Sequence, residues 1–563
     1  MAATQQPINC DLLVIGSGAA GLTAAVTAAH RGRKVLVVEK APVYGGTTAF
    51  SEGMIWVPLS EAAVRYGIAD EPAKAFRYLE RLVGNQLDRP RAHAYLEHAP
   101  AMLAFLEANS HVRYELVPTS LDYFTDVDGA QMGGRALRPG LFDGRRLGSE
   151  LKRLRRPLAS TTIFGGMSIA GADLQHLYKL KTSAASVRHV AGMTARYAAD
   201  SLKGYGRGTR LGNGNALIAA LMRTLMDQGV PVWTGAPALR LVVRDGVVTG
   251  AIVRRDGIET KISAASVLIA AGGFANSDVM KQRFYPQVAA GKAHYRLAPE
   301  DNTGDGLALA EAAGAALSTD LAEPCAWTPV SLVPQPDGSR VPYPHYLDRG
   351  KPGAISVNRR GRRFTNEAET YHRFVPAMIE TCRSDPEVEA WIVAHHPAVK
   401  KYGLGRVPPA PGRMGPFLKS GYLTRAASLG ELAAKIGVDA AGLEQTVAAF
   451  NEAARRGEDP EFGRGRTAYN RAAGDATHTP NPALGALDTG PFYAIRMVPS
   501  DISTFIGLRT DARSRVLRAD GSVVAGLYAA GNDAATPFGG TYPGAGITIG
   551  AAMTFGWVVG MGV

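Results

Sequence analysis

The sequence predicts an α/β protein in which a nucleotide-binding domain is built from both ends of the chain and an α+β domain is inserted between them. An apolar stretch, a glycine-rich turn and an alanine-rich helical pattern follow one another near the N-terminus, and a similar glycine-rich pattern returns near the C-terminus. The residues between them are richer in Pro and aromatic side chains. We therefore expect a first domain from residues 1–285 and 500–563, and a catalytic or capping domain from residues 286–499.

The start of the chain has the pattern of one β-α-β unit. Residues 11–15 and 34–38 are short apolar runs typical of buried parallel strands, and residues 19–31 form an alanine-rich periodic segment typical of a helix. A strand, a helix and a second strand in this order predict a domain of the Rossmann type.

The turn of this unit carries the motif GSGAAG at residues 16–21. Gly16 permits a tight turn, Gly18 lets the backbone approach a pyrophosphate, and Gly21 allows close packing of helix and strand. The helix N-terminus offers free N–H groups to the phosphate. Glu39 ends the next strand, where an acidic residue accepts hydrogen bonds from a ribose.

Later segments are less regular. We expect helices at residues 72–83, 92–108 and 213–229, and little regular structure between residues 121 and 210. Strands are expected at residues 239–243, 248–253, 259–262 and 267–271, because Asp245-Gly246 and Asp256-Gly257 are strong hairpin signals. The apolar run 545–563 lacks basic flanks and aromatic belts, so we expect a buried helix packed on a cofactor rather than a membrane-spanning helix.

Composition and charge restrict the class of protein. Hydrophobic residues make up 46% and charged residues 20% of the 563 residues, which excludes a largely disordered chain. Cys10, Cys325 and Cys382 lie far apart and form no C-x-x-C pair, which argues against a disulfide framework and against a structural metal site. The first ten residues lack the features of a leader peptide, so we expect a cytoplasmic protein.

The net charge of +12 favours anionic partners only weakly. A basic stretch runs from Arg135 to Arg156. We expect it to be a solvated charged face, with contact to an anionic substrate tail or to a membrane surface as alternatives. Nucleic-acid binding is not expected, because the chain has no recognition module and no aromatics interleaved with the basic residues.

Further motifs indicate the cofactor. Glu39-Lys40, the segment GGTTAFS at residues 45–51 and the segment LYAAGND at residues 527–533 resemble the FAD-dependent family of fumarate reductase flavoproteins and 3-ketosteroid dehydrogenases, over almost the whole chain. The resemblance implies FAD. Some relatives attach FAD covalently through a His, but no His lies between His30 and His93, so we expect non-covalent FAD.

The same resemblance implies a set of FAD contacts. The sequence GDG at residues 304–306 resembles the turn that lies near the cofactor in this family, and an ordinary helix cap that binds no ligand is an equal alternative. The expected contacts are Gly16, Gly18, Ala19, Ala20, Gly21, Glu39, Lys40, Gly45, Gly46, Thr47, Thr48, Ser51, Gly273, Asp305, Gly531, Asn532, Gly546 and Ile547.

Two stretches separate the branches of this family. The segment VNRRGRRFTNE at residues 357–367 resembles fumarate reductases, which carry an Arg as proton donor slightly later, where this chain has Tyr371. Arg373 lies two residues after Tyr371. An alignment shifted by two residues, with Arg373 in the place of the proton-donating Arg, therefore remains an alternative. The segment GTYPGAGIT at residues 540–548 is similar to the Tyr-Pro-Gly-x-Gly segment of 3-ketosteroid Δ1-dehydrogenases, and Tyr123 matches a further tyrosine of that family.

The matched residues suit dehydrogenation beside a ring ketone. The Tyr542 O–H and the Gly546 N–H would donate to the ketone oxygen. Tyr371, as a phenolate, would take the α-proton, and a hydrogen bond from Tyr123 would lower its pKa. The β-hydrogen would leave as hydride to flavin N5, and the helix beginning at Ile547 would point its N-terminus at the flavin.

The chain departs from the steroid enzymes in several places. Ala545 stands where they have a second Pro, Asp533 stands where a small residue is expected, and Ile506-Gly507 stands where they have two glycines. Phe505 and Ile506 are therefore expected to reshape the cavity, and residues 161–170 to form either a lid over a hydrophobic substrate or a buried loop.

These departures leave several functions open. We expect Δ1-dehydrogenation of a 3-ketosteroid, with reduction of an unidentified electron acceptor such as a quinone. A smaller cyclic ketone such as an oxocyclohexane carboxylate is an alternative substrate. A fumarate-reductase-like enoate reductase and a non-catalytic flavoprotein are alternative functions.

Overall fold

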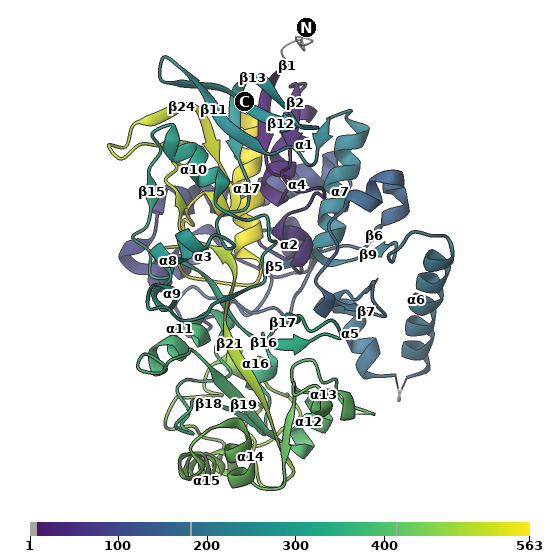
Figure 1. The fold of residues 1–563 in the computed structure, drawn as a ribbon, viewed down its shortest axis with the longest axis vertical. Helices are drawn as coiled ribbons and strands as arrows, with labels where there is room; N and C mark the ends of the chain where they lie inside the picture. The colour runs from purple at the N-terminus through teal and green to yellow at the C-terminus, as the bar shows by residue number, and fades with distance from the viewer. Residues whose placement is uncertain (1–7, 181–182, 413) are drawn as a thin grey trace.

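The computed structural model describes residues 8–180, 183–412 and 414–563. Residues 1–7, on which the expectation of no leader peptide partly rests, lie outside this part of the chain. The predicted α/β architecture is confirmed, with one large sheet in the upper half of Figure 1 and a second sheet in the lower half. The parallel part of the first sheet has the order β10 (Val232–Trp233), β2 (Val35–Val38), β1 (Ile8–Ile15), β13 (Ile258–Ile269) and β24 (Val523–Ala529).

The predicted β-α-β unit is present as β1, α1 (Ala19–His30) and β2. Both ends of the chain contribute strands to this sheet, as predicted, because β24, near the C-terminus, pairs in parallel with β13. β23 (Arg515–Leu517) closes this edge in an antiparallel pair with β24.

β13 differs from the prediction of two separate strands. It is one strand whose first half pairs antiparallel with β12 (Val247–Arg255), while its second half runs parallel to β1 and β24. The small residues 263–266 include neither Gly nor Pro, so nothing in them forces a turn and the extended chain continues through them. The two predicted hairpin turns are present, and β11 (Ala238–Arg244) pairs with β12.

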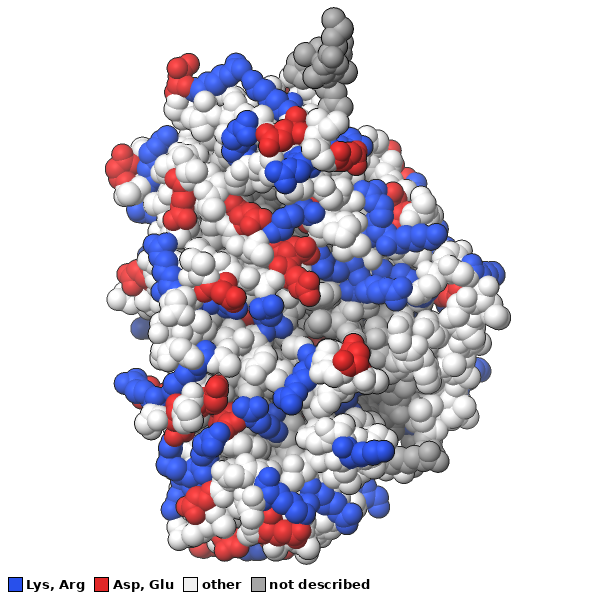
Figure 2. All heavy atoms as spheres, viewed as in Figure 1, with Lys and Arg blue, Asp and Glu red and all other residues white. Residues whose placement is uncertain are grey.

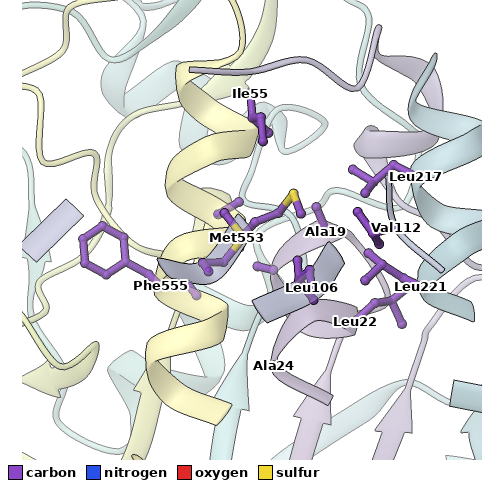
Figure 3. Close-up of a cluster of buried hydrophobic side chains, with 14 of the residues drawn as sticks. Ala19, Leu22, Ala24, Ile55, Leu106, Val112, Leu217, Leu221, Met553 and Phe555 are labelled. Atoms are coloured by element: carbon purple, nitrogen blue, oxygen red, sulfur yellow. The ribbon is translucent and has the colours of Figure 1, made fainter. Parts of the chain in front are cut away.

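α17 (Ile547–Gly562) packs along α1 and places the end of the chain beside its beginning (Figure 1). Glycines allow the close contact, because a Cβ on Gly556 would lie 2.3 Å from the Ala20 carbonyl oxygen. Figure 3 shows side chains from these helices and their neighbours meeting in one apolar cluster, with Met553 near its centre. The predicted buried helix is confirmed, and none of the helices that the structure describes has the length and hydrophobicity needed to cross a bilayer.

Several helices cover this half of the molecule. α3 (Pro72–Val83), α4 (Arg89–Asn109) and α7 (Asn213–Asp227) match the predicted segments within a few residues. The expectation of little regular structure up to residue 210 is wrong for α6 (Ala184–Leu202), which lies at the side of the molecule in Figure 1. The short elements here are β3 (Ile55–Trp56), α2 (Glu61–Arg65), β4 (Tyr114–Leu116), β5 (Ala136–Pro139), β6 (Phe142–Asp143), β7 (Thr162–Ile163), β8 (Met167–Ser168), α5 (Gly171–Tyr178) and β9 (Arg210–Leu211).

The second sheet is mostly antiparallel. Its main path is β17 (Arg340–Pro344), β16 (Cys325–Pro334), β21 (Phe492–Thr504), β19 (Ala390–His395) and β18 (Ala354–Val357), with β14 (Tyr295–Arg296) and β20 (Thr424–Ala426) also paired to β21. The predicted boundary between residues 499 and 500 lies inside β21, and the proposed division into domains remains a prediction.

Helices and short strands complete the lower half and the region between the sheets. α11 (Tyr371–Thr381) packs on β16, and α14 (Leu429–Ile436) on α15 (Ala440–Arg456). The others are α8 (Asp278–Phe284), α9 (Pro286–Ala289), α10 (Asp305–Ala312), β15 (Leu317–Ser318), α12 (His396–Tyr402), α13 (Gly415–Lys419), α16 (Ala468–Ala473) and β22 (Gly507–Leu508).

Candidate active site

A large cavity begins at the carboxyl ends of the parallel strands and extends towards the second sheet. It encloses about 1690 Å³ of space between atoms, part of it open to solvent. The carboxyl edge of a parallel sheet is the usual place for a ligand in such folds. Ile15, Val38 and Ala270 at the ends of β1, β2 and β13 line one part of the cavity, and Tyr346, Tyr371 and Ile502 line the opposite part.

The turn between β1 and α1 forms one end of the cavity. Gly16 has φ of +110°, and a Cβ at this position would lie 2.1 Å from the Ala270 carbonyl oxygen, so only glycine fits. The first residue of α1, Ala19, donates its N–H to Thr48 Oγ1 (3.1 Å), but Gly18 gives the helix no side-chain cap. The helix N-terminus therefore presents unsatisfied N–H groups to the cavity, as a pyrophosphate requires.

Glu39 is held in place beside this turn. Its Oε2 accepts hydrogen bonds from the Ser17 hydroxyl (2.6 Å) and the Ser17 backbone N–H (3.1 Å), and its Oε1 accepts one from the Ala41 N–H (2.9 Å). The Ser17 hydroxyl in turn accepts from the Gly45 N–H (3.0 Å). A carboxylate fixed in this way keeps free lone pairs for ribose hydroxyls on the cavity side.

Polar side chains from distant segments close this half of the cavity. Lys40 Nζ forms an ion pair with Asp305 Oδ2 (2.5 Å) at the start of α10. Asn302 donates to Thr47 Oγ1 (2.7 Å) and to the Gly272 carbonyl oxygen (2.9 Å). The elongated shape, the bare helix terminus and the fixed carboxylate fit an extended dinucleotide.

The other half of the cavity is walled by tyrosines. The hydroxyl oxygens of Tyr123 and Tyr371 lie 3.3 Å apart, and the rings of Tyr123 and Tyr542 stack with their centres 5.7 Å apart. The rings of Tyr371 and Tyr542 meet edge to face at 5.6 Å. Tyr346 adds a fourth ring, 4.9 Å from that of Tyr371. The three predicted tyrosines are thus brought together in one cavity.

Different elements position these rings. Tyr371 is the first residue of α11, whose Thr370 cap accepts a hydrogen bond from the Arg373 N–H. Tyr123 lies in a loop that is fixed to the segment preceding α17, because its N–H donates to the Pro543 carbonyl oxygen (3.0 Å). Tyr542 lies in that same segment. The tyrosine cluster therefore depends on three parts of the chain being folded together.

Comparison with known proteins identifies the family. Residues 11–549 match the family described as FAD binding domain. The chain belongs to that family. It is an FAD-dependent oxidoreductase of the class acting on CH–CH groups, as predicted, and the cavity described above is the candidate site for its FAD.

Several relatives of this flavoprotein match over nearly their whole length. The 4-oxocyclohex-2-ene-1-carboxylate 5-dehydrogenase of Sinomonas cyclohexanicum is 38% identical, covering 99% of this chain and 94% of the relative. The 3-oxosteroid 1-dehydrogenase of Mycolicibacterium smegmatis is also 38% identical, with 98% and 97% covered. The crystal structure of 3-ketosteroid delta1-dehydrogenase from Sterolibacterium denitrificans, in complex with 1,4-androstadiene-3,17-dione, is 34% identical with a TM-score of 0.89, covering 98% and 99%.

Most of the predicted FAD contacts of the flavoprotein line the cavity. Gly21, Gly45, Gly273 and Ile547 do not. Gly21 packs the helix on the turn, since a Cβ there would lie 2.2 Å from the Gly16 carbonyl oxygen, and Ile547 faces a smaller neighbouring pocket. The predicted contacts that do line it are Gly16, Gly18, Ala19, Ala20, Glu39, Lys40, Gly46, Thr47, Thr48, Ser51, Asp305, Gly531, Asn532 and Gly546.

Sequence reasoning missed some residues of the flavoprotein's cavity. Ser17 lies inside the recognised motif but was given no role, although it holds Glu39. Asn302 and Tyr346 have no motif around them, and only the fold brings them to the site. Glu52 follows Ser51 directly, and an acidic residue inside a glycine-rich apolar segment was a signal that could have been used.

The electrostatics of the tyrosine cluster contradict one expectation. Burial raises the pKa of Tyr371 well above 10, and the groups that face it are other tyrosines rather than a cation. The Tyr123 hydrogen bond is present, but it does not lower the pKa of Tyr371 as expected: desolvation of the phenolate raises that pKa most, and the Tyr123 hydroxyl raises it further. Tyr371 is therefore a protonated phenol at neutral pH.

Other expected features of the flavoprotein occupy different places. Phe505 and Ile506 are buried and are not among the cavity-lining residues. Phe505 lies behind Tyr542, with ring centres 6.4 Å apart, and the expectation that the two residues reshape the cavity remains a prediction. Arg373 stacks over Phe124 (4.2 Å) outside the cavity, which supports the alignment that places Tyr371 at the site. Residues 162–168 form a hairpin with Phe164 exposed at its tip.

The basic stretch of the flavoprotein is largely neutralised by acidic side chains. Arg135 is buried between Asp70 (2.8 Å) and Asp122 (2.7 Å), and Arg155 pairs with Asp301 (2.5 Å) at the cavity. On the face shown in Figure 2, basic and acidic side chains are interspersed. The paired arginines of the stretch are Arg135, Arg138, Arg145, Arg153 and Arg155.

Proposed function

We propose that this flavoprotein removes two hydrogens from adjacent carbons of a ring ketone, with a 3-ketosteroid dehydrogenated at the Δ1 position as the leading substrate. The convergence of Tyr123, Tyr371 and Tyr542 in one cavity carries the proposal. A saturated ketone needs a donor for its oxygen and an acceptor for its α-proton, and this cluster offers both beside the FAD site.

Tyr542 and Gly546 hold the ketone oxygen in this proposal. The hydroxyl of Tyr542 lies near the Gly546 N–H and the Thr548 hydroxyl, which both limit the rise of its pKa on burial. Gly546 has φ of +90°, and a Cβ there would lie 2.3 Å from the Met54 carbonyl carbon, so only glycine fits at this position of the cavity wall. Two donors aimed at one oxygen stabilise the enolate-like charge that develops as the α-proton leaves.

Tyr371 receives the α-proton, with Tyr123 as its hydrogen-bond partner. Its place at the positive end of α11 stabilises the developing phenolate. FAD, when bound, supplies the acceptor for the β-hydrogen. The small residues Gly531, Ala545 and Gly546 of the cavity lining would leave room for the flavin ring.

Non-covalent attachment of FAD is part of the proposal. His30 and His93 belong to α1 and α4 and are not among the described residues that line the cavity, and that lining includes no His or Cys. We also propose a cytoplasmic location and a quinone-like electron acceptor. A peripheral membrane contact has less support, because the predicted basic stretch is largely ion-paired.

A smaller ring ketone is the second candidate substrate. The Sinomonas cyclohexanicum relative, whose name specifies an oxocyclohexene carboxylate, is as similar to this chain as the mycobacterial 3-oxosteroid 1-dehydrogenase, at 38% identity. The cavity lining contains polar side chains as well as the apolar Leu158, Leu297 and Ile502. A small ring ketone that carries a carboxylate is therefore compatible with this lining.

Anaerobic titration of the FAD-loaded protein tests both candidates. Androst-4-ene-3,17-dione is added first and 4-oxocyclohexanecarboxylate second, while the flavin absorbance is followed and the product is identified. Bleaching with formation of the 1,4-diene supports the steroid. Bleaching by the carboxylate alone supports the smaller ketone, and no bleaching by either, with a flavin that dithionite still reduces, contradicts the proposal.

A further inference from the structure

The proposed reaction leaves the final acceptor of the α-proton open, and the following inference rests on that proposed function. Tyr371 is a protonated phenol, so it can accept a proton only while it gives up its own. Its hydroxyl oxygen lies 3.3 Å from that of Tyr123, which provides the next position for a proton. A base that is ionised near neutral pH must stand at the end of this path.

Glu52 is placed to be that base. It lies just after the turn Thr47–Phe50 and lines the cavity together with Tyr123, Tyr346 and Tyr542. Its side chain is exposed, and it belongs to the lining of this partly solvent-open cavity. Within the described part of the chain, no hydrogen bond or ion pair satisfies its carboxylate.

The other carboxylates of the cavity are already engaged. Glu39 is held by Ser17 and Ala41, Asp301 by Arg155, and Asp305 by Lys40. Arg155 and Lys40 are the two cations among the described cavity-lining residues, and both are thus paired elsewhere. Of the described carboxylates that line the cavity, Glu52 alone has neither a hydrogen-bond donor nor a cation beside it, so its carboxylate is free to accept a proton.

The groups that face Glu52 are tyrosines from several elements. Its charge acts on Tyr123 in the loop after β4, on Tyr346 after β17 and on Tyr542 before α17, and raises the pKa of all three. Partial desolvation by the surrounding protein also raises the pKa of Glu52 above its ordinary value, although the side chain stays open to the cavity. A carboxylate with a raised pKa is a stronger base than a solvated one and titrates closer to neutrality, which suits proton transfer.

We propose that Glu52 is the proton acceptor of the reaction, reached from the substrate through the hydroxyls of Tyr371 and Tyr123. The α-C–H bond breaks and an O–H bond forms on Tyr371, whose own proton passes to Tyr123. The proton of Tyr123 then passes to the Glu52 carboxylate across the solvent in the cavity that both residues line, because no direct hydrogen bond joins them. The electron pair of the C–H bond enters the new C=C bond as the β-hydrogen leaves with its pair to FAD. Both tyrosines end as neutral phenols, and Glu52 ends protonated.

Glu52→Gln tests the proposal in the FAD-loaded protein, because the amide keeps the size of the side chain and cannot accept the proton. In rapid mixing with the ketone that bleaches the wild-type flavin, we expect flavin reduction to slow by about 10²-fold at neutral pH. The wild-type rate should rise with pH through one ionisation that the variant lacks. Ketone binding, read from the perturbed flavin spectrum before reduction, should be unchanged, and Glu52→Asp should recover part of the rate.

Glu323→Gln is the matched control. Glu323 is also a carboxyl whose pKa is raised by burial, but its partner is the Trp327 Nε1–H (2.6 Å) and it does not line the cavity. This variant should keep the wild-type rate and pH profile. A Glu52→Gln protein that retains the wild-type profile overturns the proposal.

Infrared difference spectra separate this proposal from the proposed function. A carboxyl carbonyl band that titrates in the wild type and is absent from Glu52→Gln is expected whether or not a ketone is turned over. If no such band exists, the proposal for Glu52 fails even when the flavin bleaches. If the band titrates and no ring ketone bleaches the flavin, the proposed function fails. The role of Glu52 as the proton acceptor of that reaction then fails too.

Discussion

The hydroxyl oxygens of Tyr123 and Tyr371 lie 3.3 Å apart although 248 residues separate them in the chain. Tyr123 comes from the loop between β4 and β5, which is tied to the segment before α17, and Tyr371 begins a helix that packs on β16 of the second sheet. The contact joins the two halves of the molecule at the site of the proposed chemistry. Small movements between the halves therefore change the distance over which a proton passes.

Replacing the proposed proton-accepting tyrosine should abolish most of the activity. In Tyr371→Phe, we expect the rate of flavin reduction by a ring ketone to fall by about 10²–10⁴-fold, because the hydroxyl that receives the α-proton is lost. Stopped-flow absorbance measures the rate, and the flavin spectral shift on mixing measures binding, which should persist. Tyr469→Phe is the control, since Tyr469 packs on Tyr123 at 5.2 Å without lining the cavity. Equal rates in the two variants would contradict the assignment.

Tyr542→Phe should show a different pattern. The loss of one donor to the ketone oxygen is expected to slow reduction by about 10²–10³-fold and to weaken ketone binding as well. The proposed role of Tyr542 is excluded if reduction slows while a ketone inhibitor binds as tightly as before. Titration of the flavin spectrum with a non-reducing aromatic ketone measures that affinity directly.

Gly16→Ala should prevent stable FAD binding. Besides its φ of +110°, the new Cβ would lie 2.1 Å from the Ala270 carbonyl oxygen, so the turn and the end of β13 must separate. Gly32→Ala is the matched control, because Gly32 also has positive φ (+79°) but has nothing within 4 Å of a Cβ. The control should lose about 1 kcal/mol of stability and keep its flavin, while Gly16→Ala should purify largely without flavin. The flavin-to-protein absorbance ratio reports the difference.

His372 should make the stability depend on pH. Burial lowers its pKa from 6.5 to about 4, and its Nε2 lies 3.1 Å from the Gly540 carbonyl oxygen. Since the folded pKa lies below the unfolded one, the unfolded state binds the extra proton. The contribution of His372 is complete above pH 6.5 and is lost as the pH falls towards 4, by about 1.4 kcal/mol per pH unit.

His372→Gln separates this effect from other titrations. The neutral amide cannot gain the proton, so the difference in unfolding free energy between wild type and variant should narrow steadily between pH 6.5 and pH 4. Denaturant unfolding at a series of pH values measures it. Parallel curves for the two proteins would show that His372 is not the titrating group.

The first β-α-β unit was predictable to within a few residues because local signals determine it. The motif at residues 16–21, the apolar strands and the alanine-rich helix agree with one another. β13 was divided in error, because whether an extended chain continues depends on neighbouring strands on both sides, which a sequence does not display. α6 was missed because its surroundings are rich in Gly, Arg and Pro.

The tyrosines of the site could be predicted only through separate motifs and a resemblance to a family. The protonation states of these tyrosines could not be predicted from the sequence. The pKa of Tyr371 is decided by how much water the fold removes and by the absence of a nearby cation among the described residues, and both are properties of packing. Tyr346 and Asn302 lie outside any motif, so their positions at the cavity follow from the tertiary structure alone.

The packing of α17 on α1 also has a consequence for how the protein is made. The ribosome releases Ala19–His30 early and Ile547–Gly562 near the end of synthesis, yet the two helices share one apolar cluster and both border the FAD site. A nascent chain that stops before Ile547 lacks one wall of that site. We therefore expect the cavity to bind FAD only after Ile547–Gly562 has been synthesised and packed on α1.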